Sequence, residues 1–269
     1  MKKILLVALV SGLSAQVEAD SSGVNFYAGV SAVGSWTSSD FKMDYEVDTT
    51  SSATFKNAVP HAYHKDNSIG RAGAGFTIGV KKKFENNFFV GGEFGYTLSH
   101  AKHHHDFTYL EDIEADPTTI TPGGEKTGII SRINVKHGDE LALALKFGKD
   151  CKSCGIYGIV GVTTKNVEIG YSVDGDTDWT NLKDDKFSVS EKERAWGAVL
   201  GLGGSKKIND RISCSLEYRY KTYGSAEKDV DCRAESKKAF ANNEHDISDR
   251  HFKVKSDKHE VSLGITVNI

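Results

Sequence analysis

The chain has 269 residues, enough for one large domain or two small ones. It contains 27 Gly, 13 Phe and 10 Tyr but only 3 Pro, a composition typical of a sheet-rich protein with bends and few rigid linkers. The net charge of −3 gives no indication of nucleic-acid binding, so we expect no nucleic-acid partner.

The N-terminus contains the three parts of an export signal in order. A basic segment, residues 1–3, precedes an apolar run, residues 4–10, that is too short to span a bilayer. Small residues at the cleavage positions predict a signal peptide of residues 1–19 and a mature start at Asp20, with a cut after Ala15 as the alternative. No later run approaches the ~18 apolar residues of a membrane helix. The mature chain is therefore expected to be secreted, periplasmic, or inserted in the outer membrane as a sheet.

Eight later segments alternate between apolar residues and small or polar ones, the period of a β-strand with one apolar face. In chain order they are residues 25–36, 70–80, 88–98, 141–148, 156–164, 195–205, 212–221 and 261–269. In the fifth segment we assign Ile156, Val160 and Val162 to the apolar face, although Tyr157 and Ile159 disturb the pattern. Segments of roughly 9–11 residues are long enough for tilted strands to cross a bilayer.

The connections between these segments alternate between long and short. The long ones cover about residues 37–68, 99–139, 165–193 and 223–258. Short periplasmic turns and long outer loops are typical of outer-membrane barrels, whereas a soluble sandwich has no reason to sort its loops by length. We therefore predict an all-β, eight-stranded antiparallel up-and-down transmembrane β-barrel over residues 20–269.

The two strand faces favour a membrane barrel over a soluble one. A soluble barrel should carry Lys, Glu, Thr and Asn on its outer face, but here the less apolar face is mostly Gly, Ala, Ser and Thr. The apolar face has aromatic residues near strand ends, including Trp36, Tyr96, Trp196 and Tyr218, where the aromatic girdles of membrane barrels lie. We predict that the apolar face contacts outer-membrane lipid.

Several segments resemble those of a known family. The opening strand Phe26-Tyr27-Ala28-Gly29-Val30, the segments 92–96 and 216–220, and the ending 261–269 resemble small outer-membrane β-barrels. These are the porin-like and opacity-type surface proteins of Gram-negative bacteria, similar in plan to the OmpA membrane domain and OmpX. The resemblance implies a C-terminal strand that the barrel-assembly machinery reads as an insertion signal. Its residues here are Val261, Leu263, Ile265, Val267 and Ile269, and the final Ile269 departs from the family's usual aromatic residue.

Isolated charges occur on the less apolar face of the predicted strands. They are Arg71, Glu93, Lys146, Glu217, Arg219 and Lys221. Buried charges must pair with one another, and an eight-stranded interior is just wide enough for side chains to fill it. We therefore expect an ionic network across the lumen, the alternative being a selectivity filter in an open pore.

Two groups in the connections are candidate ligand or redox sites. The tract His100, His103, His104 and His105 is either a metal-binding segment or a solvated loop. Cys151 and Cys154 form a C-x-x-C in a short turn, which in an exported protein suggests a local disulfide. A thioredoxin-like role would need a βαβ context that this sequence lacks. We expect no cofactor.

Two of the long connections continue the strand alternation beyond the predicted membrane spans. Phe41, Met43, Tyr45 and Val47 alternate with charged residues, and Val167, Ile169, Tyr171 and Val173 also recur at every second position. Strands that rise above the bilayer either bind partners through their edges or merely cap the barrel.

These patterns together predict a structural outer-membrane surface protein whose loops serve adhesion or contact with a host or partner. The alternative is a narrow porin-type channel for small solutes. An outer-membrane enzyme is the third class; His137 and Asp139 are candidates, but no nucleophile–base–orienter arrangement stands out and we expect no enzyme.

Overall fold

The computed structural model describes residues 23–45, 67–98, 101–109, 129–175, 186–230 and 250–269. These residues form nine strands: β1 (Val24–Tyr45), β2 (Asn67–Lys83), β3 (Phe88–Leu98), β4 (Ala101–Tyr109), β5 (Ile129–Asp150), β6 (Cys154–Gly175), β7 (Lys186–Lys207), β8 (Ile212–Val230) and β9 (Arg250–Asn268). Among them, no helix is long and apolar enough to cross a membrane. The predicted signal peptide, residues 1–19, lies outside the described residues.

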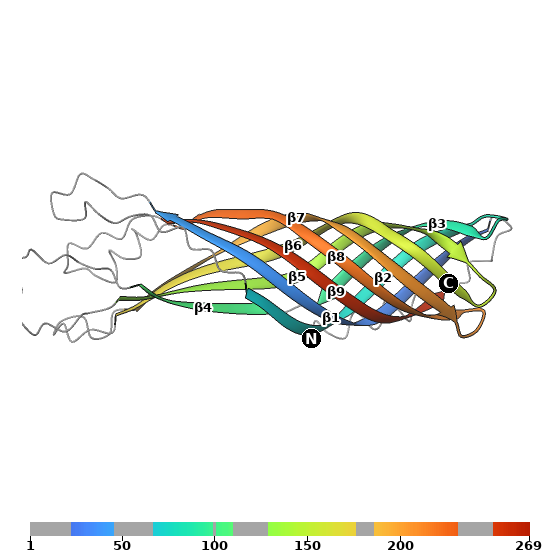
Figure 1. Ribbon diagram of the computed structural model, residues 1–269, viewed down its shortest axis with the longest axis horizontal. Helices are drawn as coiled ribbons and strands as arrows, with labels where there is room; N and C mark the ends of the chain where they lie inside the picture. The colour runs from blue at the N-terminus through green and yellow to red at the C-terminus, as the bar shows by residue number, and fades with distance from the viewer. Residues whose placement is uncertain (1–22, 46–66, 99–100, 110–128, 176–185, 231–249) are drawn as a thin grey trace, which may run out of the picture.

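The strands form a closed antiparallel ring (Figure 1). β2 pairs with β1 and with β3, and the strands from β5 to β9 pair in chain order. β1 also pairs with β9. β3 and β4 pair with successive parts of β5, so the two strands together occupy one position in the ring. The pairing of β3 with β5 completes the ring, and the predicted eight-stranded up-and-down barrel is confirmed.

Three short connections lie at one end of the barrel, which we call the turn end. Asn87 in the first of them has φ 65°, a left-handed conformation that Asn tolerates better than most residues. In the third, the Asn209 side-chain oxygen accepts hydrogen bonds from two backbone amides, those of residues 211 and 212. The amide of Ile269 donates to the carbonyl of Phe26 at 2.9 Å, which fastens the last strand to the first. The opposite end is called the loop end.

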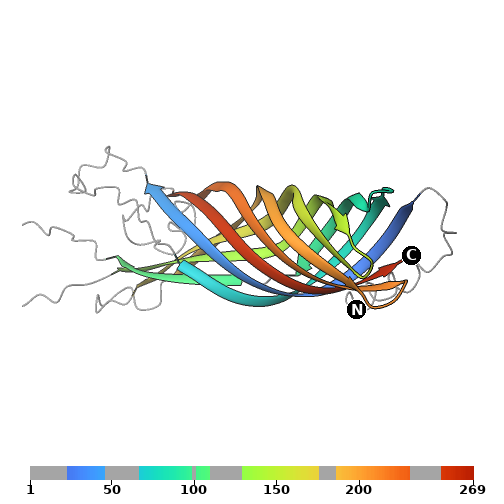
Figure 2. The ribbon, with the colours of Figure 1, turned by 45° about the vertical axis from the view of Figure 1, so that its right-hand side comes forward.

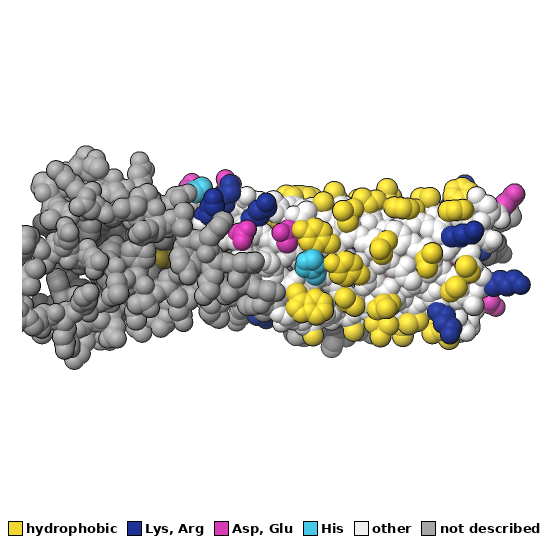
Figure 3. All heavy atoms as spheres, in the orientation of Figure 1, with side chains coloured by type: hydrophobic (Ala, Val, Ile, Leu, Met, Phe, Trp, Pro, Cys, Tyr) yellow, Lys and Arg dark blue, Asp and Glu magenta, His cyan; other side chains and the backbone are white. Residues whose placement is uncertain are grey.

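A band of large apolar side chains surrounds the outer surface nearer the turn end (Figure 3). Leu143, Leu202 and Leu263 are 58–69% exposed, and Ile156, opposite in direction to the buried Tyr157, is 70% exposed. An exposed apolar surface of this extent is stable against lipid and not against water. The band is therefore the membrane-spanning part of the barrel.

The two faces of β9 exchange polarity along an unbroken strand. From Val261 to Val267 the outward residues are apolar, whereas the outward residues from 251 to 257 are His, Lys, Lys and Asp. Over that second part Phe252 and Val254 point inward and are 0% and 2% exposed. The pairing of β9 with β1 continues through this region without a register shift. Since no bulge turns the strand over, the surroundings of the strand change from lipid to water near His259.

The ring opens toward the loop end into two facing sheets (Figures 1 and 2). β8 leaves β7 beyond the pair Tyr223–Gly197 and continues beside β9 alone. β3 leaves β2 beyond the pair Leu98–Ala74, and β4 then pairs with β5. Within the described residues, one sheet therefore consists of the ends of β2, β1, β9 and β8, and the other of β4, β5, β6 and β7.

An apolar core fills the space between these two sheets. Its members are Phe41, Val135, Val167, Ile169, Tyr171, Ala195, Tyr223, Ala226, Phe252 and Val254. The ring of Phe252 lies 5.8 Å from that of Phe41 and 5.9 Å from that of Tyr171, between centroids. The core draws on both sheets, so hydrophobic burial holds the loop end together where cross-strand hydrogen bonds no longer close the ring.

The strands are longer than the sequence predicted, and the predicted loop limits need correction. β1 continues to Tyr45 instead of ending near residue 36, and β9 begins at Arg250 instead of residue 261. β5 begins at Ile129 and β6 ends at Gly175, both well inside the predicted loops. The prediction followed an apolar face that points at lipid, and it stopped where that face turns polar. The alternation noted at Phe41 and Ile169 belongs to these extensions.

Candidate functional site

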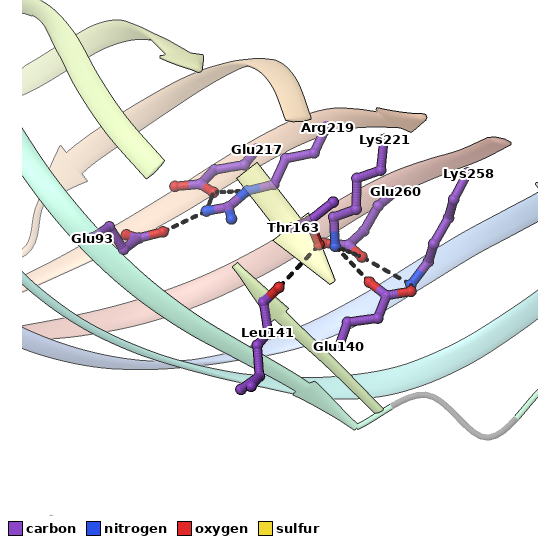
Figure 4. Close-up of polar contacts among 9 residues, drawn as sticks. All are labelled: Glu93, Glu140, Leu141, Thr163, Glu217, Arg219, Lys221, Lys258 and Glu260. Carbon is purple, nitrogen blue, oxygen red and sulfur yellow. Dashed lines mark hydrogen bonds and ion pairs between the residues drawn. The ribbon is translucent and has the colours of Figure 1, made fainter. Parts of the chain in front are cut away.

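The interior of the barrel contains two clusters of buried charges at different positions along the strands, and Figure 4 shows them side by side. The turn-side cluster consists of Glu93 on β3, Lys146 on β5, and Glu217 and Arg219 on β8. The Lys146 ammonium lies 2.5 Å from Glu93 Oε2 and 2.7 Å from Glu217 Oε1. Arg219 donates from Nη2 to Glu93 Oε1 at 2.6 Å and from Nε to Glu217 Oε2 at 2.9 Å. Two carboxylates thus meet two cations within the membrane span, and the cluster is electrically balanced.

Two tyrosines complete the turn-side cluster. Tyr27 donates to Glu93 Oε2 at 3.1 Å, and Tyr157 donates to Glu217 Oε1 at 2.8 Å. Each carboxylate therefore accepts a neutral hydrogen bond in addition to its ion pairs. Charges removed from water are tolerated only when their hydrogen-bonding capacity is met in this way.

The loop-side cluster consists of Glu140 on β5, Lys221 on β8, and Lys258 and Glu260 on β9 (Figure 4). Lys221 lies 2.8 Å from Glu140 Oε2 and 2.8 Å from Glu260 Oε2. Lys258 lies 2.8 Å from Glu140 Oε1 and 3.1 Å from Glu260 Oε2. All four side chains are at most 4% exposed. The cluster lies where the outer surface of β9 changes from apolar to polar, and it joins β5 to β8 and β9 across the lumen.

Polar and aromatic side chains connect the loop-side cluster to the apolar core. The ammonium of the buried Lys165 donates to Ser256 Oγ at 2.7 Å and lies 3.9 Å from the ring centroid of Tyr223, a cation–π contact. Nearby, Ser39 Oγ and His137 Nε2 are 3.2 Å apart, and both residues are buried. These contacts lie inside the wall and are not exposed to solvent.

A cavity of about 120 Å³ occupies the lumen between the turn end and the level of Glu260. Its lining includes Tyr27, Glu93, Lys146 and Arg219. This volume accommodates a few water molecules. Glu260 of the loop-side cluster lines the cavity, and the other members of that cluster and the apolar core lie beyond it, toward the loop end.

The structure places the six predicted lumen charges in different groups. Glu93, Lys146, Glu217 and Arg219 form the turn-side cluster, and Lys221 belongs to the loop-side cluster. The sequence assigned Arg71 and Glu93 to one ionic network, but the structure separates them along the strands. Arg71 is opposite Ser35, whereas Glu93 is opposite Gly79, eight residues farther along β2, or about 26 Å at ~3.3 Å per residue. Arg71 instead lies opposite Ser35 on β1, and Ser35 in turn lies opposite Glu260 on β9.

Sequence reasoning missed six charged residues of the interior. Lys81 and Asp150, an ion pair at 2.7 Å, lay just outside the predicted strand segments. Glu140, Lys165 and Lys258 were assigned to loops or their margins, and Glu260 was left just outside the terminal strand. The sequence did contain a signal for two of them. Lys258 and Glu260 lie four and two residues before the inward Ser262, so strand alternation places them on the same inward face.

The remaining sequence candidates contribute no assembled site to the described structure. A bulge between His137 and Glu140 directs His137 inward, while Asp139 accepts a hydrogen bond from Tyr96 at 2.6 Å. Among the described residues, no group of three or more His, Cys, Asp or Glu is arranged to hold a metal. His100 lies outside the described residues, as do the side chains of His103, His104 and His105, whose backbone belongs to β4.

The C-x-x-C motif lies on the turn between β5 and β6. Cys151 and Cys154 are exposed free thiols, and the amide of Cys151 donates to the carbonyl of Cys154 at 2.6 Å. The two thiols also share a side-chain hydrogen bond. The disulfide stays a prediction.

Comparison with solved structures finds 83 similar chains. The outer membrane protein OprG from Pseudomonas aeruginosa matches with a TM-score of 0.52 and 14% identity, over 90% of this chain and 95% of that one. Ail, the attachment invasion locus protein of Yersinia pestis, matches at 0.34 and 11%, over 90% and 99%. The outer membrane protease OmpT from Escherichia coli matches at 0.44 and 12%, over 95% and 100%. At these identities the first likeness shows the fold alone, and the lower scores of the other two carry no argument.

No curated protein matches this chain. A family model described as outer membrane protein beta-barrel domain matches residues 5–254, which is most of the chain. The closed ring, the apolar outer band and this match agree, and they place the protein in the bacterial outer membrane. The chain therefore belongs to the outer membrane protein β-barrel family.

Proposed function

We propose that this protein is a non-conducting surface protein whose barrel serves as a rigid stalk for adhesion or for contact with a host or partner. The observation that carries the proposal is the apolar core between the two sheets of the loop end. A channel for polar solutes needs a continuous wet path, and buried aromatic rings occupy that path where the strands rise above the membrane. The alternative, a narrow porin-type channel, would have to pass this core and both ion clusters.

The length of the strands supports a stalk. On β9 the stretch from Arg250 to His259 carries polar residues outward, and nine steps of ~3.3 Å make about 30 Å of strand. With a strand tilt of about 35–45°, the wall rises roughly 20–25 Å above the lipid. The described strand ends at the loop end of this wall are the points from which the four long connections start.

Two partners follow from the membrane location, and we include both in the proposal. The apolar band takes outer-membrane lipid, and the terminal strand, residues 261–269, serves as the signal for the barrel-assembly machinery. The apolar alternation of Val261, Leu263, Ile265 and Val267 on the outward face supports the second role.

Attachment of whole cells tests the adhesive role. Bacteria that display the full chain should bind host cells or purified matrix more strongly than cells without it. Replacing the four connections, residues 46–66, 110–128, 176–185 and 231–249, by short turns should abolish the gain while the barrel remains folded. Unchanged attachment after all four replacements would refute contact through the loops.

Conductance in planar bilayers tests the alternative. The full protein should give no steady channels. Steady currents that change in the Glu93→Gln variant would favour the channel, because Glu93 lines the cavity.

A further inference from the structure

The free edge of β7 is the strongest unassigned surface of the stalk. From Lys186 to Trp196 this strand pairs with β6 on one side, and its pairing with β8 begins only at Gly197. Within the described residues, the other edge of this segment has no strand beside it. The register with β6 runs from Lys186 to Lys206 without a shift, so the edge is straight and regular.

The edge of β8 across the same opening differs in kind. A register shift between Tyr223 and Ala226 marks a bulge in β8 where it parts from β7. Its outward Glu227 is paired with Lys253, and Asp229 with His251, both on β9. Bulges and charges are the usual protection of strand edges against pairing. β7 lacks the bulge, so its backbone groups are the ones available to another strand.

The outward face beside this edge carries an excess of positive charge. Lys136 on β5 lies 2.5 Å from Glu168 Oε1, and Lys192 on β7 lies 3.9 Å from Glu168 Oε2. Arg194 donates from Nε to the amide oxygen of Asn166 at 3.5 Å, a neutral acceptor. Two lysines thus share the Glu168 carboxylate while Arg194 contacts a neutral amide, and the Lys192 side chain is 77% exposed. Glu191 and Glu193 of the same strand belong to the opposite face, that of Val189 and the buried Ala195. An added strand with carboxylates at alternate positions would face Lys192 and Arg194.

We propose that the β7 edge from Ser188 to Arg194 binds an extended acidic segment of a partner protein by strand addition. This rests on the proposed function, because the edge lies on the part of the barrel that rises out of the lipid. Backbone hydrogen bonds supply the affinity in such complexes, and side chains at alternate positions supply the specificity.

A second copy of this chain fits the edge poorly. Two copies in one membrane have β7 running in the same direction, so their edges would meet in parallel. Lys192 and Arg194 of each copy would then approach those of the other, and like charges on adjacent strands are destabilising. Charge complementarity favours an acidic partner instead.

Hydrogen exchange and peptide binding test the proposal on the full chain in phosphatidylcholine vesicles. The probe is a fluorescein-labelled nine-residue peptide of alternating Asp and Thr. Alternate residues of an edge strand direct their amides away from the sheet, so alternate amides between 188 and 194 should exchange quickly alone and slowly with peptide. The double variant Lys192→Glu with Arg194→Glu should bind the peptide about 10-fold more weakly or worse.

The matched control is the double variant Lys253→Glu with Lys255→Glu. It makes the same charge change on β9, which is paired on both sides, and it should leave peptide affinity within about 2-fold. An equal loss in the control would reduce the binding to general charge attraction and overturn strand addition. Protection of alternate β7 amides without peptide would show that a segment of this chain already covers the edge, which also overturns the proposal. If strand addition fails in this way but cell attachment still depends on the loops, the proposed function stands. Failure of strand addition and failure of the proposed function are therefore distinguishable.

Discussion

Replacing Glu140 by Gln is the sharpest test of the charged interior. Glu140 accepts from Lys221 and from Lys258, both at 2.8 Å, and it is 3% exposed. The substitution keeps the size of the side chain and removes its charge. Two buried ammonium groups then depend on Glu260 alone, at 2.8 and 3.1 Å.

The expected loss follows from the number of partners that remain. Removing one partner of a buried ion pair costs about 3–5 kcal/mol, because an uncompensated charge stays out of water. Glu260 still contacts both lysines and the Gln amide oxygen still accepts one hydrogen bond, so we expect the lower limit, about 3 kcal/mol. With a urea dependence of about 2–3 kcal/mol per molar, the unfolding midpoint should fall by about 1–1.5 M.

Urea titration in phospholipid vesicles measures this change, with heat-modifiable gel mobility reporting the folded fraction. Glu227→Gln is the matched control, since Glu227 pairs with Lys253 at 2.5 Å but both side chains are more than two-fifths exposed. Exposed pairs of this kind add little, and the control should leave the midpoint nearly unchanged. Equal midpoints for the two variants would refute the argument that burial of the loop-side cluster sets its importance.

Four further outcomes are expected. Phe252→Ala should lower the free energy of unfolding in the same titration by about 3–5 kcal/mol, because it empties the centre of the apolar core; a change below about 1 kcal/mol would contradict that packing. Leu263→Lys should cost about 2–4 kcal/mol if Leu263 faces hydrocarbon, and an unchanged midpoint would place it in water. In protein that has folded after export to the oxidising periplasm, Cys151 and Cys154 should resist thiol alkylation until a reductant is added. Full labelling without a reductant would exclude the disulfide. Ile269→Phe should speed barrel assembly in pulse-labelled cells, and equal rates would argue against the terminal signal.

The membrane-spanning part of the fold was predictable because lipid and lumen impose a strict alternation on every strand. Even the disturbed segment from Ile156 to Val162 was assigned to the correct faces, with Tyr157 and Ile159 inward. The inward charges could be recognised from parity as well. Their grouping could not, because parity gives the face of a residue but not its height. The separation of Arg71 from Glu93 depends on the stagger between β1, β2 and β3, which the turns and the pairing of distant strands determine together.

The extension above the membrane was harder to predict for a different reason. An apolar residue at every second position indicates one buried face, but it does not say whether that face is buried by lipid or by protein. Along β9 both answers occur on the same strand, with Leu263 outward in lipid and Phe252 inward in the core. Between these two parts of β9, neither face of the strand is covered by lipid or by the apolar core. The loop-side cluster lies at that level. Its four charges satisfy one another across a lumen that neither lipid nor the apolar core fills. Removal of any one of these charges would leave its partners buried with one counter-charge fewer at this level. This is the physical reason to expect Glu140, Lys221, Lys258 and Glu260 to act as one unit.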